Sequence, residues 1–191
     1  MSAFLMSTLV VALAEIGDKT MLLAILLSAR FRKPLPILVA LFFATLVNHT
    51  VAAFIGDRVE GLIDIPIVRY AVALSFIAIG LWIAIPDRVD ETHGKLKQRG
   101  NLFLTALGAF FLVEFGDKTQ LATLALAAQY RDVVAVTAGS TLGLMLVNIP
   151  AVLLGERINR VISFANARRL ASITFIALGL WELARLIGWV G

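Results

Sequence analysis

The sequence contains no cysteine and has few charged residues. Of its 191 residues, 16% are charged and 60% are hydrophobic, and the mean hydropathy is +0.91. Without cysteine the chain forms no disulfide and no thiolate metal site, and it cannot use a thiol in catalysis. A soluble globular domain is about 45–50% apolar and about 25% charged, so the shortage of charge predicts a membrane protein.

Histidine and the common hydrolase motifs are also scarce. The chain has two histidines, and it contains neither a G-x-S-x-G nor an H-E-x-x-H sequence. These absences disfavour a serine hydrolase or a zinc peptidase. Residues 1–14 carry no Lys or Arg, so they lack the basic region of a signal peptide, and we expect them to belong to the mature protein.

Six apolar stretches are long enough to cross a bilayer as helices, since about 20 residues span roughly 30 Å of hydrocarbon. Lipid tolerates spanning helices or closed barrels, and no alternating strand pattern is present. We therefore predict an all-α membrane protein with six transmembrane helices. They lie near residues 4–28, 35–56, 67–85, 101–128, 133–154 and 169–189.

The two halves of the chain repeat each other at an offset of about 99 residues. The segment 76–82, FIAIGLW, matches 175–181, FIALGLW, and Asn48 matches Asn148. Each repeat holds three spans, so the second must enter the membrane from the opposite side. We predict two inverted three-helix repeats, residues 1–85 and 101–191, joined by a cytoplasmic linker at 86–100.

Basic residues indicate the orientation. Of the 17 Lys and Arg residues, eleven fall in the first, third and fifth loops or at their edges, and four fall on the other side. The positive-inside rule then makes those three loops cytoplasmic and puts both termini outside a cell or inner membrane. The net charge of +4 is explained in this way by the membrane, and no nucleic acid partner is expected.

Two hexapeptides place three ionisable residues each inside long apolar runs. They are Glu15-Ile16-Gly17-Asp18-Lys19-Thr20 and Glu114-Phe115-Gly116-Asp117-Lys118-Thr119. A charge at bilayer depth costs at least about 2.5–3.5 kcal/mol, so intramembrane carboxylates indicate function. On a continuous helix Glu, Asp and Lys of each motif share one face. If the repeats cross near the midplane, four carboxylates converge on one point.

We therefore predict a metal site formed by Glu15, Asp18, Glu114 and Asp117. Four carboxylates and two ammonium groups sum to a charge of −2, which one divalent cation or two protons would neutralise. Oxygen ligands suit hard cations such as Mn²⁺, Ca²⁺ and Mg²⁺. The accessory positions are Lys19, Thr20, Asn48, Lys118, Thr119, Gln120 and Asn148, with Glu182 and His49 given less weight.

Two features of the motifs leave alternatives open. Gly17 and Gly116 either break their helices, which would expose backbone carbonyls as further ligands, or let helices pack closely. The charges also have a purely structural interpretation, in which Glu15 pairs with Lys19 and Glu114 with Lys118 to join helices. An unpaired carboxylate in each copy speaks against that interpretation as the whole explanation.

The doubled E-φ-G-D-[KR]-[TS] motif, one copy per three-span repeat, resembles the Ca²⁺/Mn²⁺ transporter family that includes bacterial MneA-type manganese exporters. The resemblance covers essentially the whole chain, and both copies fit the motif. It implies a six-span secondary transporter that moves Mn²⁺ or Ca²⁺ out of the cytosol against protons. By position, the acidic motif residues of the family fall on Glu15, Asp18, Glu114 and Asp117.

The sequence therefore predicts a transporter and not an enzyme. It exports divalent cations, with Mn²⁺ favoured over Ca²⁺, in exchange for H⁺, and it needs no cofactor besides the transported ion. Its partners are the cation, the proton and the lipid bilayer. The alternatives are a membrane-embedded metal-dependent hydrolase, and a structural membrane subunit whose charges pair helices. Oligomeric state, coupling stoichiometry and the number of ion sites are not determined by the sequence.

Overall fold

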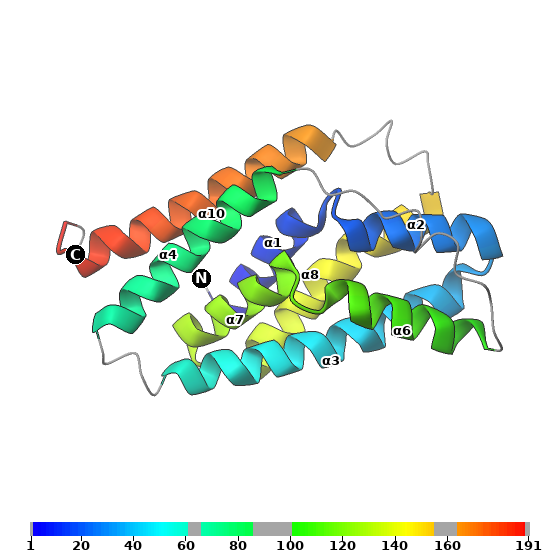
Figure 1. Cartoon of the computed structure of the whole chain (residues 1–191), viewed down its shortest axis with the longest axis horizontal. Helices are drawn as coiled ribbons and strands as arrows, with labels where there is room; N and C mark the ends of the chain where they lie inside the picture. Colours follow the sequence, from blue (N-terminus) through cyan, green and yellow to red (C-terminus); the bar gives the residue numbers. More distant parts are fainter. Residues whose placement is uncertain (1, 61–65, 86–100, 155–163, 190–191) are drawn as a thin grey trace.

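The computed structural model describes residues 2–60, 66–85, 101–154 and 164–189, and these form eight α-helices (Figure 1). The predicted linker at 86–100 lies outside the described residues. The helices are α1 (Ala3–Glu15), α2 (Lys19–Phe31), α3 (Pro34–Glu60), α4 (Pro66–Ala84), α6 (Leu102–Glu114), α7 (Lys118–Tyr130), α8 (Val133–Leu154) and α10 (Phe164–Leu186).

The two halves contain the same series of helices. Each begins with two 13-residue helices, α1 and α2 or α6 and α7, and continues with a long helix, α3 or α8. Each half then ends with one further helix, α4 or α10. The predicted spans at 4–28 and 101–128 are each broken in two at the charged motif.

The same local signals recur at the helix ends of both halves. Asn101 caps α6 by accepting a hydrogen bond from the Phe103 N–H (2.9 Å), and Ser2 does the same for α1 through the Leu5 N–H (3.4 Å). After α2 and α7 the chain turns through a left-handed residue, Arg32 or Arg131, whose N–H donates to the last turn. The next helix then starts within three residues.

The halves pack crosswise. Helix α1 lies against α8 and α6 lies against α3, while α3 contacts α8 and α4 runs beside α10 (Figure 1). Small residues allow this close approach. A Cβ at Gly143 would lie 2.4 Å from the Thr8 carbonyl oxygen, and one at Gly56 would lie 2.2 Å from that of Leu124. Such small-residue contacts are typical of helices that associate in lipid.

The pair formed by α4 and α10 covers only one part of the bundle. Helix α4 packs against α7, and α10 packs against α1. The contacts that would be equivalent in the other half, α4 with α6 and α10 with α2, are at most slight among the described residues. Figure 1 shows α2 and α6 extending away from α4 and α10 toward the opposite end of the molecule. The arrangement is therefore asymmetric, although the two halves are alike.

The distribution of polarity is that of a protein in lipid. Large apolar side chains lie on the outside, for example Leu112 (72% exposed) and Val134 (78%), whereas the motif carboxylates are buried. By length and composition, two helices among the described residues can cross a membrane, Pro34–Arg58 and Val133–Leu154. Three shorter apolar helices accompany them, Ala3–Glu15, Arg69–Ala84 and Leu102–Glu114.

Candidate cation site

Both charged motifs lie at helix breaks. Helix α1 ends at Glu15 and α2 begins at Lys19, and Gly17 between them has a φ of +80°. Gly116 has a φ of +75° at the corresponding break between α6 and α7. Glycine adopts this backbone conformation without the steric cost that other residues pay. Of the two predicted roles for these glycines, the helix break is confirmed.

The break changes how the motif side chains are arranged. Glu15 is the last residue of α1, whereas Asp18 is the N-cap of α2, so the prediction that Glu, Asp and Lys share one face of a continuous helix was wrong. The Asp18 N–H donates to the Glu15 carbonyl (3.0 Å), and the Asp117 N–H donates to that of Glu114 (3.1 Å). Each aspartate thus lies at the positive end of a helix dipole.

Two ion pairs cross between the repeats. Lys118 Nζ lies 2.8 Å from Asp18 Oδ1, and Lys19 Nζ lies 2.8 Å from Asp117 Oδ1. The pairing expected within each motif, Glu15 with Lys19 and Glu114 with Lys118, is not the one observed in either of these bridges. The two pairs differ in access to solvent, because the Lys19 side chain is 31% exposed and that of Lys118 only 3%. The crossed pairs join the two helix breaks into one cluster.

Each motif glutamate is held by the long helix of the other repeat. Asn148 Nδ2 of α8 donates to Glu15 Oε1 (3.0 Å), and Thr45 Oγ1 of α3 donates to Glu114 Oε1 (2.8 Å). Asn148, one of the predicted accessory positions, thus lies beside the motif of the first repeat. Thr45 was missed by sequence reasoning. It lies one turn before Asn48, and that spacing on the same helical face is a signal that could have found it.

Asn48 and Gln120 support the break between α6 and α7. Asn48 Nδ2 donates to the Phe111 carbonyl (3.3 Å), and Gln120 Nε2 donates to the Asn48 carbonyl (3.4 Å). The Gln120 side-chain oxygen in turn accepts a hydrogen bond from the Gly116 N–H. Asn48 and Asn148, which occupy equivalent positions in the repeats, each donate through the amide nitrogen to a backbone carbonyl, that of Phe111 and that of Leu144.

Several buried oxygen atoms at the cluster have no hydrogen-bond partner among the described residues. They are Glu15 Oε2, Glu114 Oε2, Thr20 Oγ1, Thr119 Oγ1 and Asn148 Oδ1. Leaving a buried polar atom unsatisfied costs about 1–3 kcal/mol, so such atoms are candidates for a ligand. Carboxylate, hydroxyl and amide oxygens are ligands that hard divalent cations prefer. The composition of this oxygen set fits the predicted cation class.

The carboxylates are not gathered as a metal shell in this arrangement. No group of three or more His, Asp and Glu side chains within the described ranges is close enough to hold a metal ion. Instead, the lysine ammonium groups lie against the two aspartates. Binding of one ion by all four carboxylates therefore requires the lysines to move, and we treat it as a proposal below.

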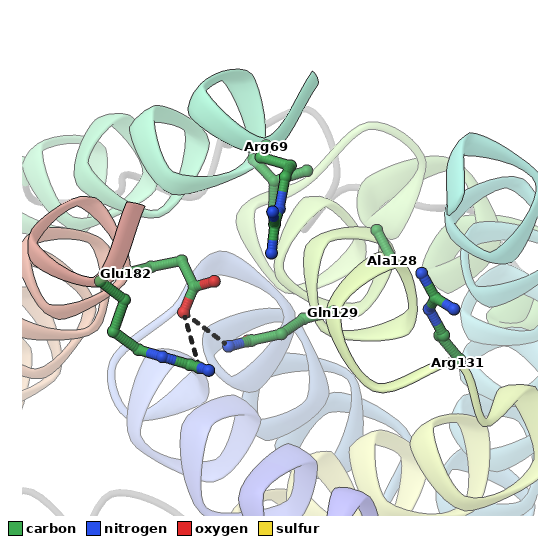
Figure 2. A pocket seen from close by; sticks show the side chains of 7 residues that line it. Arg69, Ala128, Gln129, Arg131 and Glu182 are labelled. Carbon is green, nitrogen blue, oxygen red and sulfur yellow. Dashed lines mark hydrogen bonds and ion pairs between the residues drawn. The ribbon is translucent and has the colours of Figure 1, made fainter. Parts of the chain in front are cut away.

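Glu182 lies at a different place. It lines a pocket of about 200 Å³ between α4, α7 and α10, together with Arg69, Val72, Ala128, Gln129, Arg131 and Arg185 (Figure 2). Its Oε2 accepts a hydrogen bond from Gln129 Nε2 (3.5 Å) and pairs with Arg185 Nη1 (3.5 Å). The Glu182 carboxylate therefore contacts residues near the C-terminal ends of α7 and α10.

The sequence matches a family of known transporters. The profile of the divalent cation/proton antiporter GDT1 family covers residues 3–91 and 102–187, which include all eight helices. The chain belongs to the GDT1 family. The resemblance inferred from the doubled motif is confirmed, and so is the conclusion that the protein is a transporter and not an enzyme. A divalent cation is cargo in such a protein, so no cofactor is implied.

Several curated GDT1 relatives are similar over most of this chain. A Vibrio cholerae protein named "Putative manganese exporter" is 46% identical over 157 residues, which are 82% of this chain and 78% of that protein. GDT1-like protein 4 of Oryza sativa subsp. indica is 26% identical over 203 residues (93% and 72%). A GDT1-like protein of Synechocystis is 26% identical over 195 residues (92% and 93%). No solved structure was found to match the chain.

Proposed function

We propose that this protein exports a divalent cation, Mn²⁺ in preference to Ca²⁺, in exchange for H⁺, through a site built from Glu15, Asp18, Glu114 and Asp117. Membership of an antiporter family and the name of the Vibrio relative support the class of cargo and the coupling. The observation that carries the proposal is the crossed pairing, in which each motif aspartate binds the lysine of the other repeat. A site shared by both repeats can respond to their relative movement.

The membrane topology belongs to the same proposal. Residues 1–85 and 101–191 would form two inverted repeats of three spans, with α1 plus α2 and α6 plus α7 as two broken spans. The like order of helices in the halves and their crosswise packing support this. The loops rich in Lys and Arg would face the cytoplasm, the linker at 86–100 among them, and both termini would lie outside the inner membrane.

Lys19 and Lys118 act as internal cations whose contacts with the two aspartates the transported ion replaces, while both ammonium groups stay within the cluster. With both ammonium groups in place the cluster carries a formal charge of −2, and one divalent ion neutralises it. Two protons do so equally well. Because an uncompensated charge is costly inside a membrane, the carrier crosses between its two states only when the cluster is neutralised. The proposed exchange is therefore one divalent ion for two protons.

The asymmetric position of α4 and α10 supports alternating access. In the proposed topology α1 and α7 are the outer halves of the broken spans, and α2 and α6 are the inner halves. The helix pair packs on the outer halves in this arrangement. If the two repeats exchanged their conformations, α4 and α10 would pack on the inner halves, α2 and α6, instead. Inverted repeats allow such an exchange. Lys19 is the more exposed lysine, so the Lys19–Asp117 pair is the one that faces the inner side, which α4 and α10 cover less.

Ion flux in liposomes tests this proposal. Purified protein is offered Mn²⁺, Ca²⁺ and Mg²⁺ in turn under an imposed pH gradient, and each flux is compared in Asp117→Asn and in the control Asp57→Asn. Asp57 is an acidic residue near the end of α3 and is not part of either motif. We expect wild type and the control to move Mn²⁺ fastest and Asp117→Asn to move none. Equal flux in all three proteins would refute the assigned site.

A purely structural role of the charges is the second candidate, because the crossed pairs also hold the repeats together. It predicts that the protein moves no divalent ion and that Asp117→Asn only lowers thermal stability. The flux and unfolding measurements on the same preparation separate the two functions.

A further inference from the structure

His49 is a buried imidazole that the proposed exchange has not used. Its side chain lies in the middle of α3 and is 1% exposed, and neither ring nitrogen has a hydrogen-bond partner among the described residues. Burying a polar group without a partner costs about 1–3 kcal/mol. The equivalent position of the second repeat holds Ile149, so the helix pairing itself does not require an imidazole. The cost therefore marks the imidazole as a candidate ligand.

The helical register places His49 on the face of α3 that meets the cation cluster. Side chains four residues apart lie one above the other on a helix. Four residues before His49, Thr45 donates to Glu114. Four residues after it, Ala53 belongs to a buried cluster with Ala14 and Ala122. Ala14 directly precedes Glu15, and Ala122 lies one turn after Lys118, so the residues one turn before and after His49 belong to the packing around the two motifs.

We infer that His49 supplies a nitrogen ligand to the transported ion and so selects first-row transition metals such as Mn²⁺ over Ca²⁺ and Mg²⁺. This inference rests on the proposed function. The other candidate ligands are all oxygens, which bind hard cations without strong preference among them. Ca²⁺ and Mg²⁺ take oxygen ligands, whereas affinity for a site that contains nitrogen rises along the first-row transition metals, a series that begins with Mn²⁺. One imidazole in an otherwise oxygen site therefore gives the discrimination that the carboxylates lack.

His49 joins the site when the ion replaces the lysine contacts of the two aspartates. In the present arrangement no three His, Asp and Glu side chains of the described part gather at metal-binding distance. Displacement of Lys19 and Lys118 by the ion frees Asp117 and Asp18 to approach it. Glu114 is already held by Thr45, on the helical face that carries His49. The imidazole lies one helical turn from Thr45, the residue that holds that carboxylate, and can therefore reach an ion bound there.

Electron spin-echo spectroscopy of bound Mn²⁺ tests this assignment directly, because a coordinated imidazole produces ¹⁴N modulation. The protein is purified without a polyhistidine tag, and three forms are compared: wild type, His49→Ile and His93→Gln. The last variant removes the other histidine of the chain. We expect the ¹⁴N signal in wild type and in His93→Gln, and its loss in His49→Ile. A ¹⁴N signal that persists in His49→Ile, or that wild type with bound Mn²⁺ lacks, overturns the inference.

Competition flux provides the second readout. We expect the preference for Mn²⁺ over Ca²⁺ to fall by about tenfold in His49→Ile, equivalent to about 1.4 kcal/mol. An unchanged preference would refute the role of His49 but leave the proposed function standing. Loss of all divalent flux in wild type would refute both. If His49→Ile does not fold, His49→Gln is used instead. The glutamine amide binds ions through oxygen, so this variant should also lose the ¹⁴N modulation and the preference for Mn²⁺ over Ca²⁺.

Discussion

The crossed ion pairs lead to a quantitative prediction about stability. Removing Lys118 in Lys118→Met leaves the Asp18 carboxylate without this partner, and both side chains are almost fully buried, at 3% and 0% exposure. Breaking a buried pair by removing one partner costs about 3–5 kcal/mol. Lys19 is 31% exposed, so water compensates Asp117 in part when Lys19→Met is made. We expect that loss to be about 1–2 kcal/mol, between the values for buried and surface pairs.

Thermal unfolding in detergent, followed by circular dichroism, measures these losses. For a chain of this length 1 kcal/mol corresponds to about 2–4 °C, so Lys118→Met should lower Tm by about 6–20 °C and Lys19→Met by about 2–8 °C. Adding Asp18→Asn to Lys118→Met should restore most of the loss, because the uncompensated charge is then removed. Adding Glu114→Gln should not, since Glu114 is not the observed partner of Lys118. Rescue by Glu114→Gln instead of Asp18→Asn would show that the pairing runs within each motif, contrary to this account.

Further variants test the site, the helix break, the packing and the topology. Asp117→Asn should abolish Mn²⁺ flux without preventing membrane insertion, as judged by flux and by recovery from membranes. Gly116→Ala should cost about 1–2 kcal/mol in the unfolding assay, because φ is +75° although no atom lies within 4 Å of the new Cβ. Gly143→Ala should disrupt the contact of α8 with α1, whereas the matched control Gly108→Ala, which meets no neighbour, should unfold as wild type does. Lys33→Cys should react with a membrane-impermeant thiol reagent only from the cytoplasmic side, and labelling from outside would overturn the orientation.

Much of the architecture could be predicted from the sequence, because apolar length and repetition are local properties. The stretch at 133–154 became helix α8, and that at 35–56 became most of α3. The repeat at an offset of about 99 residues predicted two halves with the same helix order, and the helices follow it. The motif that carries the family resemblance was visible for the same reason, since it stands inside apolar runs in both halves.

The pairing of the charges could not be predicted, because it depends on the helix break. Sequence spacing placed Glu15 and Lys19 on one face, but that holds only if the helix continues through Gly17. The positive φ of Gly17 ends α1 at Glu15 and starts α2 at Lys19, and the ammonium of Lys19 reaches Asp117 of the other repeat instead. Thr45 was missed because its one signal is its position a turn before Asn48, and that position acquires a role only through the contact with Glu114.

The central claim is that a divalent cation and protons exchange through one cluster shared by the two repeats. It is tested most directly by trapping a pH-sensitive dye in liposomes that contain the purified protein and imposing a Mn²⁺ gradient with no pH gradient. The account predicts that Mn²⁺ moving inward drives protons outward, that two protons move per ion, and that Asp18→Asn and Asp117→Asn each stop both movements. Mn²⁺ flux with no change in internal pH, or proton movement that persists in either variant, would contradict it.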